Sequence, residues 1–259
     1  MDYKIKGKLA FVTAGAHGIG QAIANLLTEE GAKVIVADQD KGALAENGRN
    51  WAGTFAADLT TAQGVDGAVS YVLKTFGRAP DILINNVGVA DPNSLVDISD
   101  EKWSWSFDIN LRPTIRTCRA LLPGMAELGS AAIVNTASDL AKQPEPDLMD
   151  YGVFKSGLLY MTKALAKQYA PRVRVNAVSP GPIWTGLFTR PGGIVDQIAE
   201  KFNVDKEGAV KKFLEDRYLP FGIGQPEDVA HAVVFLASPL AKFISGANLD
   251  LGGTLRGNL

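Results

Sequence analysis

Three side chains in the middle of the sequence could together move a proton. Tyr151 and Lys155 are four residues apart, so on a helix they share one face, and Ser138 lies thirteen residues upstream of the tyrosine. A free tyrosine has a pKa of about 10, which is too high for an efficient base near neutrality. A nearby ammonium favours the phenolate, and a serine hydroxyl can hydrogen-bond a substrate oxygen. The set predicts proton transfer at an alcohol or carbonyl; the alternative is an ordinary pair on a helix surface.

A glycine-rich turn near the amino terminus could hold a dinucleotide. The segment from Thr13 to Gly20 reads Thr-Ala-Gly-Ala-His-Gly-Ile-Gly and joins a strand pattern to a helix pattern. Gly18 and Gly20 let the backbone approach a pyrophosphate, which the amino-terminal end of the following helix attracts. Asp38 ends the next strand pattern, where a carboxylate accepts hydrogen bonds from the adenosine ribose and repels a 2′-phosphate. Gln39 follows it instead of a basic residue, so the sequence predicts NAD. The alternative is a tight turn without a ligand.

Composition excludes several classes of function. The 259 residues carry a net charge of −2, which argues against a nucleic-acid or anionic-membrane surface. Cys118 is the one cysteine, so there is no disulfide framework. His17 and His231 are too few for a histidine zinc site and poorly spaced for a Ser-His-Asp triad. No apolar run has the length of a signal segment or a membrane span. We therefore expect a cytoplasmic protein with no metal, no nucleic-acid partner and no membrane association.

Short β-branched runs alternate with helical patterns along the chain. Seven strands separated by helices predict an α/β fold, a Rossmann-type doubly wound parallel sheet with helices on both faces. The expected strands are 9–12, 33–37, 54–57, 82–84, 132–136, 174–178 and 248–251, and the expected helices are 18–30, 62–76, 100–121, 151–169 and 226–237.

No repeat, linker or low-complexity tract divides the chain, so we expect one NAD-binding domain over residues 1–259. One segment breaks the alternation. Between residues 184 and 218 there is no strand pattern, only two amphipathic stretches at 194–202 and 206–217. A long excursion of this kind in a compact domain is usually a lid or an interaction arm. We therefore predict a substrate lid at 184–218.

Together, these motifs resemble the short-chain dehydrogenase/reductase family, in its single-domain form, over nearly the whole length. The turn is similar to the family's Thr-Gly-x-x-x-Gly-x-Gly, with Ala14 in place of its first glycine. The run Asn-Asn-Val-Gly that ends at Gly88 resembles the family's Asn-Asn-Ala-Gly. Near the carboxyl terminus, Gly252 stands where the family's Asp-Gly-Gly has its aspartate.

The resemblance implies a role for each matching residue. It implies a catalytic tetrad of Asn110, Ser138, Tyr151 and Lys155, in which the lysine also holds the nicotinamide ribose and the asparagine anchors a water. The implied cofactor-binding residues are Gly15, His17, Gly18, Ile19, Gly20, Asp38, Asp58, Leu59, Asn86, Gly88, Tyr151, Lys155, Pro180, Gly181, Ile183 and Thr185. The family also commonly forms homotetramers, so we expect one here.

The substrate is a small molecule whose identity the residues define only by class. The pocket candidates, chosen by position, are Asp139, Leu140, Gln143, Met149, Trp184 and Phe188. The two aromatic candidates for the pocket are more often core or lid packing at such positions. We predict hydride transfer between NAD and a secondary alcohol or ketone on a cyclic or polyhydroxylated molecule, such as a sugar or cyclic diol. One alternative is an NAD(P)H-dependent ketoreductase of the 3-oxoacyl type. Another is a non-catalytic NAD-binding protein, because the fold does not determine the function.

Overall fold

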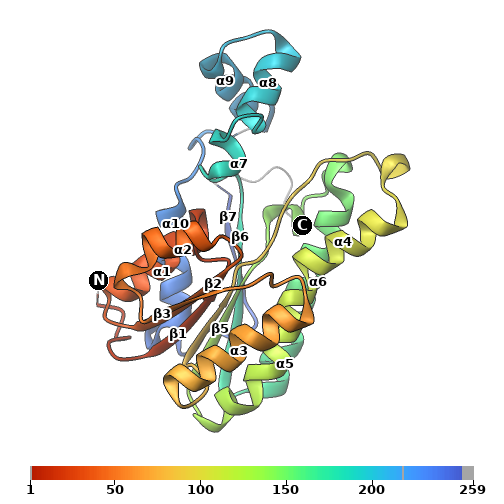
Figure 1. Cartoon of the computed structure of the whole chain (residues 1–259). Coiled ribbons are helices and arrows are strands. Elements are labelled where there is room, and N and C mark those ends of the chain that lie inside the picture. The colour runs from red at the N-terminus through yellow and green to blue at the C-terminus, as the bar shows by residue number, and fades with distance from the viewer. Residues whose placement is uncertain (1, 218, 253–259) are drawn as a thin grey trace.

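The computed structural model describes residues 2–217 and 219–252. Its centre is a seven-stranded sheet in the order β3-β2-β1-β4-β5-β6-β7, and each neighbouring pair of strands is parallel (Figure 1). The order reverses between β1 and β4, as in Rossmann folds, and this confirms the predicted doubly wound sheet. The strands are β1 (Leu9–Thr13), β2 (Lys33–Asp38), β3 (Gly53–Ala56), β4 (Ile82–Asn85), β5 (Ala131–Thr136), β6 (Val173–Pro180) and β7 (Asn248–Leu251).

Helices cover both faces of the sheet and give it two separate cores (Figure 1). Successive strand residues point to opposite faces, so Val12 of β1 packs under one layer of helices and Phe11 packs under the other. The first layer contains α1 (Gly18–Glu29), α2 (Lys41–Asn47) and α10 (Pro226–Ala237). The second contains α3 (Ala62–Phe76), α5 (Arg112–Glu127) and α6 (Met149–Tyr169), with α4 (Asp100–Asn110) packed on α5 and α6.

The structure differs from the predicted elements in two helical regions and, by one or two residues at an end, in most strands. The helix expected over 100–121 is two helices, because the chain breaks at Leu111, where φ is −131° and ψ is −45°. Pro113 then occupies the first turn of α5, where its missing N–H costs nothing. The sequence analysis missed α2, which begins after Asp40, whose side chain accepts a hydrogen bond from the Ala43 N–H. Strand β3 begins and ends one residue earlier than predicted.

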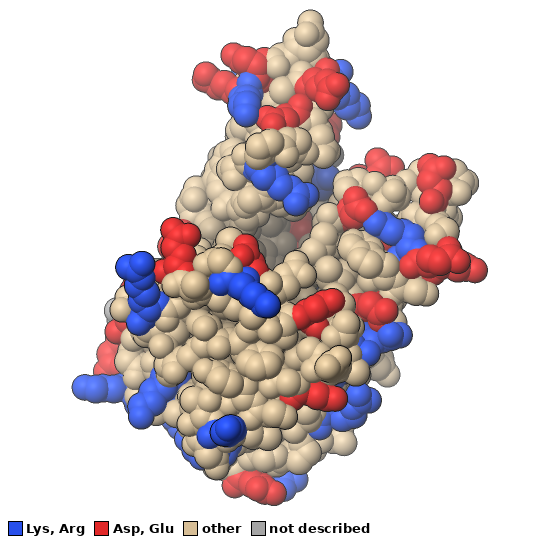
Figure 2. Space-filling model, viewed as in Figure 1, with Lys and Arg blue, Asp and Glu red and all other residues tan. Residues whose placement is uncertain are grey.

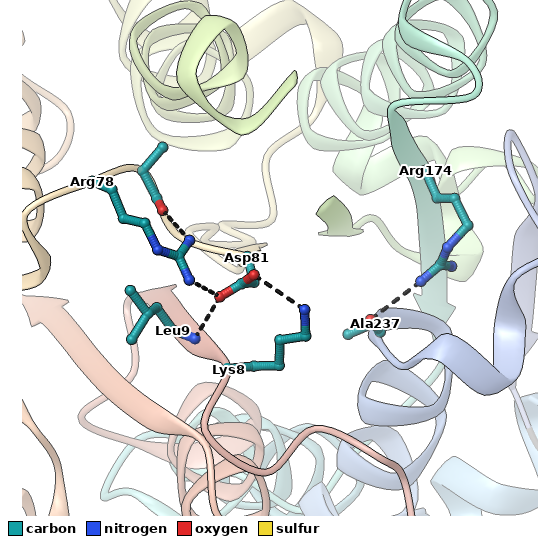
Figure 3. Close-up of polar contacts among 7 residues, drawn as sticks. Lys8, Leu9, Arg78, Asp81, Arg174 and Ala237 are labelled. Carbon is teal, nitrogen blue, oxygen red and sulfur yellow. Dashed lines mark hydrogen bonds and ion pairs between the residues drawn. The ribbon is translucent and has the colours of Figure 1, made fainter. Parts of the chain in front are cut away.

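One carboxylate holds the amino-terminal edge of the sheet. Asp81, one residue before β4, accepts hydrogen bonds from the Leu9 N–H at 2.9 Å and from Lys8 Nζ at 3.2 Å (Figure 3). Arg78 donates to it as well, at 2.8 Å. Burial alone would raise the pKa of this carboxyl, but the three donors outweigh burial and lower its pKa below the usual value. The ionised carboxylate therefore fixes the start of β4 beside the start of β1.

At the same edge, Arg174 of β6 binds the carboxyl end of α10. Its guanidinium donates to the carbonyl oxygens of Leu236, Ala237 and Ser238 at 2.7, 3.2 and 2.9 Å, and Figure 3 shows the contact with Ala237. A cation at this end of a helix satisfies carbonyls that have no partner within the helix and complements its dipole. The cavity lined by Asp81 and Arg174 therefore lies between polar contacts that hold β1, β4, β6 and α10 together.

Three helices project from the body as an arm, which we define as residues 184–217. They are α7 (Gly186–Thr189), α8 (Ile194–Phe202) and α9 (Lys206–Arg217), and they extend beyond the carboxyl ends of the strands (Figure 1). The arm has its own apolar cluster, built on Phe188, Val195 and Ala209 and separate from the two sheet cores. The amphipathic stretches expected at 194–202 and 206–217 are indeed helices; residue 218, the predicted end of the lid, lies outside the described residues.

Helices long and apolar enough to span a membrane are absent from residues 2–217 and 219–252.

Candidate active site

Most of the predicted catalytic residues follow the carboxyl ends of central strands. Ser138 lies two residues beyond β5, and Tyr151 and Lys155 lie on the first turns of α6. This helix packs on β6, and its Lys155 donates to the Thr136 carbonyl of β5. Asn110 is the last residue of α4, which contacts α6. All four are largely buried or half-buried, and the side chain of Lys155 is 2% exposed. In Figure 2 the molecule is hollowed here, between the arm and the side formed by α4.

Burial opposes charge on both members of the Tyr-Lys pair. It raises the pKa of Tyr151 to about 12, with a small opposing effect from the Ser138 hydroxyl and a small reinforcing one from the Asp139 carboxylate. Burial also lowers the pKa of Lys155 to about 7, and its Nζ lies 5.6 Å from the centroid of the tyrosine ring. In the protein alone, burial therefore favours the neutral phenol, and stabilisation of the phenolate by Lys155 together with a positive nicotinamide ring stays a prediction. Activation of the phenol needs a further positive charge at the site.

The ammonium of Lys155 is held by main chain rather than by an acid. Its Nζ donates to the Thr136 carbonyl oxygen at 2.9 Å. A Cβ added at Gly88 would lie 2.6 Å from the same nitrogen and 3.1 Å from Asn110 Oδ1, so a glycine is needed there. Asn110 binds Val89, the residue after Gly88. Its Oδ1 accepts from the Val89 N–H at 2.9 Å, and its Nδ2 donates to the Val89 carbonyl at 3.1 Å. The segment after β4 thus packs directly on the lysine.

The glycine-rich turn has the close backbone contacts that a phosphate-binding turn needs. Gly18 has a φ of +52°, and Ala14 has a φ of +50°, which explains why the family has glycine at the latter position. A Cβ at Gly20 would lie 2.2 Å from the Ala14 carbonyl oxygen. Asn86 donates from Nδ2 to that same oxygen at 3.1 Å, so the segment after β4 braces the turn. A Cβ added at Gly18 would lie 3.1 Å from Thr185 Cγ2, so the arm contacts the glycine-rich turn through this threonine.

Asp38 is buried and braces the turn from the side of β2. Its Oδ2 accepts from the Ala16 N–H and its Oδ1 from the Asp40 N–H, each at 3.0 Å. Two carboxylate oxygens offer about four lone pairs, so acceptor capacity is left for ribose hydroxyls. His17 Nε2 pairs with Asp40 Oδ2 at 2.8 Å, so the histidine of the turn faces a second carboxylate. These residues fit a dinucleotide whose adenosine end meets negative charge.

Several other predicted residues have structural roles in the chain. Leu59 and Ile183 are buried in the two sheet cores, where Ile19 packs as well. Asp58 Oδ1 accepts from the N–H and hydroxyl of Thr60. A Cβ at Gly15 would lie 2.7 Å from Val36, so this glycine lets the turn pack against β2.

Of the substrate candidates, the aromatic pair belongs to the arm. Phe188 is 4% exposed and meets Trp184 and Phe213 edge to face, with ring centroids 5.6 and 5.3 Å apart. Leu140 is half-buried in the short 3₁₀ helix Asp139–Ala141, and Gln143 is half-buried just beyond it. Leu140 and Gln143 therefore lie on the body close in sequence to the catalytic serine, whereas the two aromatic residues pack within the arm.

One of the pocket candidates, Asp139, contacts the catalytic serine directly. Ser138 Oγ donates to Asp139 Oδ1 at 3.0 Å. Burial raises the pKa of Asp139, while the serine hydroxyl, the Leu140 N–H and the charge of Arg217 oppose that effect. Arg217, at the end of α9, also pairs with Glu145 at 3.0 Å and so joins the arm to the loop beside the serine. The sequence feature that points to this contact is the position of an acid directly after the predicted catalytic serine.

The comparison with known families agrees with this fold and arrangement. The family model described as enoyl-(acyl carrier protein) reductase matches residues 13–253. Curated relatives at least 30% identical extend over almost the entire chain. The chain belongs to the short-chain dehydrogenase/reductase family, whose members are oxidoreductases that use nicotinamide cofactors.

Similar proteins within the family act on different substrates. The chain is 34% identical to the 3-oxoacyl-[acyl-carrier-protein] reductase FabG of Vibrio harveyi, over 96% of this chain and 97% of the relative. It is also 34% identical to the D-threitol dehydrogenase of Mycolicibacterium smegmatis, over 97% and 94%. Among solved structures, the L-sorbose reductase of Gluconobacter frateurii in complex with NADPH and L-sorbose has a TM-score of 0.93, with 30% identity and full coverage of both chains.

Proposed function

We propose that this protein transfers hydride between NAD and a secondary alcohol or ketone on a cyclic or polyhydroxylated small molecule. The observation that carries the proposal is the grouping of Ser138, Tyr151 and Lys155 beyond the carboxyl end of β5, with the lysine fixed to the Thr136 carbonyl at 2.9 Å. Parallel α/β sheets bind their ligands at this edge, next to the point where the strand order reverses. The similarity to a sugar reductase and a tetritol dehydrogenase supports the substrate class.

Each residue of the group has a separate task. The phenol oxygen of Tyr151 takes the hydroxyl proton when an alcohol is oxidised and returns a proton when a ketone is reduced. The Ser138 hydroxyl binds the reacting oxygen and fixes its distance from that phenol. When bound, oxidised NAD would accept the hydride that leaves carbon and would add a positive charge to the site that Lys155 helps to form. That charge offsets the burial that raises the pKa of Tyr151 to about 12.

The cofactor would be held by the glycine-rich turn, by Asp38 and by Lys155. The N–H groups at the start of α1 receive the pyrophosphate, and Asp38 accepts the hydroxyls of the adenosine ribose. Lys155, buried beside Gly88, binds the nicotinamide ribose. We propose a preference for NAD over NADP, because Asp38 and Asp40 both oppose a 2′-phosphate. The complex of L-sorbose reductase with NADPH shows that a similar fold accepts the phosphorylated cofactor, so the preference depends on these side chains.

The cofactor proposal is tested by comparing kcat/KM for NAD and NADP on one substrate. The wild type should favour NAD. Asp38→Asn keeps an acceptor for the Ala16 N–H but removes the charge, and should narrow that preference. The matched control is Asp66→Asn, which removes a charge from an exposed position of α3. It should leave the preference for NAD unchanged. Equal or better use of NADP by the wild type contradicts the proposal.

A second candidate function is reduction of 3-oxoacyl thioesters, which the 34% identity to the Vibrio harveyi reductase favours. A panel of sugars, cyclic alcohols, cyclic ketones and a 3-oxoacyl thioester, each with NAD and NADP, separates the two. We expect turnover of the hydroxylated compounds and at least ten times lower kcat/KM for the thioester. Efficient use of the thioester alone would assign the second function.

A further inference from the structure

The carboxylate of Asp139 is placed to bind a hydroxyl that neighbours the reacting oxygen. Its Oδ1 accepts hydrogen bonds from Ser138 Oγ at 3.0 Å and from the Leu140 N–H at 2.8 Å. No hydrogen bond to its Oδ2 is found among the described residues. A ligand hydroxyl can therefore bind this carboxylate at Oδ2, or take the place of the serine at Oδ1.

The spacing of these groups matches two adjacent hydroxyls. In a vicinal diol the two oxygens lie about 3 Å apart when gauche, close to an ordinary hydrogen-bonding separation. The Ser138 oxygen and the Asp139 carboxylate are separated by the same distance, 3.0 Å. A substrate whose reacting oxygen contacts the serine thus presents its neighbouring hydroxyl to the carboxylate. The charge of Asp139 also reaches the Tyr151 phenol, so the three groups surround one small volume.

A neighbouring hydroxyl would also release the serine for catalysis. The Ser138 proton points to the Asp139 carboxylate, so it is not directed at a carbonyl oxygen. A substrate hydroxyl that donates to the carboxylate replaces the serine there, and the serine proton can then turn to the ketone. When a ketone without that hydroxyl binds, the Ser138–Asp139 hydrogen bond must break and no new hydrogen bond to the carboxylate replaces it.

The rest of the surroundings favour a small polar ligand over a long apolar one. Burial raises the pKa of Asp139, and the charge of Arg217 opposes that effect in part. Arg217 also pairs with Glu145, so the arm brings further charge to this side of the site. At Gly181, an added Cβ would lie 3.5 Å from Asp139 Oδ2 and 2.9 Å from the Gly252 Cα. The chain beyond β6 therefore lies close to the carboxylate and limits the space beside it.

We propose that Asp139 is a specificity-determining residue that accepts a hydrogen bond from the hydroxyl next to the reacting carbon, so that the protein takes vicinal diols and the corresponding α-hydroxyketones. This inference rests on the dehydrogenase function proposed above and narrows its substrate class. A hydrogen bond to a charged group changes binding by about 10- to 100-fold, which sets the expected size of the effect.

The test uses pairs of substrates that differ by one hydroxyl: cyclohexane-1,2-diol against cyclohexanol, and butane-2,3-diol against butan-2-ol. All isomers of each diol are assayed with NAD. The wild type should show a kcat/KM at least ten times higher for one diol isomer than for its mono-alcohol. Asp139→Ala should bring that ratio close to one, through a larger loss of kcat/KM on the diol than on the mono-alcohol. The ratio is internal to each variant, so it does not depend on the fraction of folded protein.

Two further measurements make the result specific. In Asp139→Asn the amide can still hold the Leu140 N–H, and the ratio should fall to an intermediate value, mainly through a higher KM for the diol. Asp66→Asn, a charge removed from exposed α3, should leave the ratio unchanged. Equal wild-type activity on diol and mono-alcohol, or a ratio that survives in Asp139→Ala, overturns the role of Asp139 while the dehydrogenase function stands. No turnover of any alcohol or ketone overturns both.

Discussion

Replacing Gly88 by alanine should disable the site while leaving the fold nearly intact. Gly88 is not among the glycines with a positive φ, so its backbone accepts an alanine without strain. The added Cβ would lie 2.6 Å from Lys155 Nζ. Non-bonded carbon contacts are normally about 3.5 Å, so the ammonium must move by about 1 Å. That shift stretches its 2.9 Å hydrogen bond to the Thr136 carbonyl beyond normal range.

The size of the loss follows from that displacement. A 1 Å error in the position of a group at the reacting centre can lower the rate by about 10²-fold. Affinity for NAD should fall as well, because the proposed partner of the lysine is the nicotinamide ribose. Stability should change by about 1 kcal/mol or less, since alanine restricts the unfolded chain and offsets part of the lost hydrogen bond.

Steady-state kinetics, calorimetric titration with NAD and thermal unfolding should be measured on the same preparation. Gly67→Ala is the matched control: it adds the same methyl group inside α3, 3.2 Å from the Phe55 ring and away from the lysine. That variant should keep wild-type kinetics. The reasoning fails if Gly88→Ala retains turnover and NAD affinity within about threefold of the wild type, or if Gly67→Ala loses as much activity.

Four other outcomes are expected. Tyr151→Phe should lower turnover by about 10²–10⁴-fold with NAD binding kept, and Lys155→Met should impair both; a phenylalanine variant with most of its activity would contradict the proton-transfer role. The pKa of Asp81 is lower in the folded state, so its contribution to stability is complete above the unfolded pKa of about 4 and is lost as the pH falls through the folded value. Asp81→Asn should therefore cost about 1–3 kcal/mol near neutral pH and less in acid, as measured by urea unfolding. If the arm is a lid, its amide hydrogens should gain protection from exchange when NAD and substrate bind; high protection without ligand would argue against this. We expect a homotetramer, partly because Tyr160 on α6 is 80% exposed, and sedimentation as a monomer at micromolar concentration would refute it.

The sequence predicted the sheet because its strands are short, apolar and evenly separated. The central runs, such as the one that ends at Val12, are buried on both faces, so local pattern and final environment agree. The same reasoning joined α4 to α5, because the polar and apolar spacing continues through Leu111 and only the proline two residues later marks the break. It missed α2, whose seven residues are too few to show a helical period.

The candidate site was predicted in its residue types but not in its contacts. Spacing brought Tyr151 and Lys155 to one helix face, and the structure has them there. It could not show that the lysine binds the Thr136 carbonyl, or that Asp139 accepts from the serine, because these contacts join residues whose separation in the sequence carries no periodic signal. The raised pKa of Tyr151 in the protein alone could not be predicted for a related reason: the effect of burial depends on the surrounding chain, which no local motif describes.

The separate core of the arm has a consequence for how this protein can be re-engineered. Phe188, Val195 and Ala209 pack with neighbours from residues 184–223, and none of these belongs to the two cores that flank the sheet. Amino-acid libraries confined to that cluster can therefore repack it without altering the layers that hold β1, β4 and β5 in register. A chimera that exchanges this segment with a relative would have a new arm next to an unchanged sheet and glycine-rich turn. The two junctions deserve most care: Ile183 pairs with Gly224 in a parallel bridge, so both ends of the exchanged piece leave the body at one point.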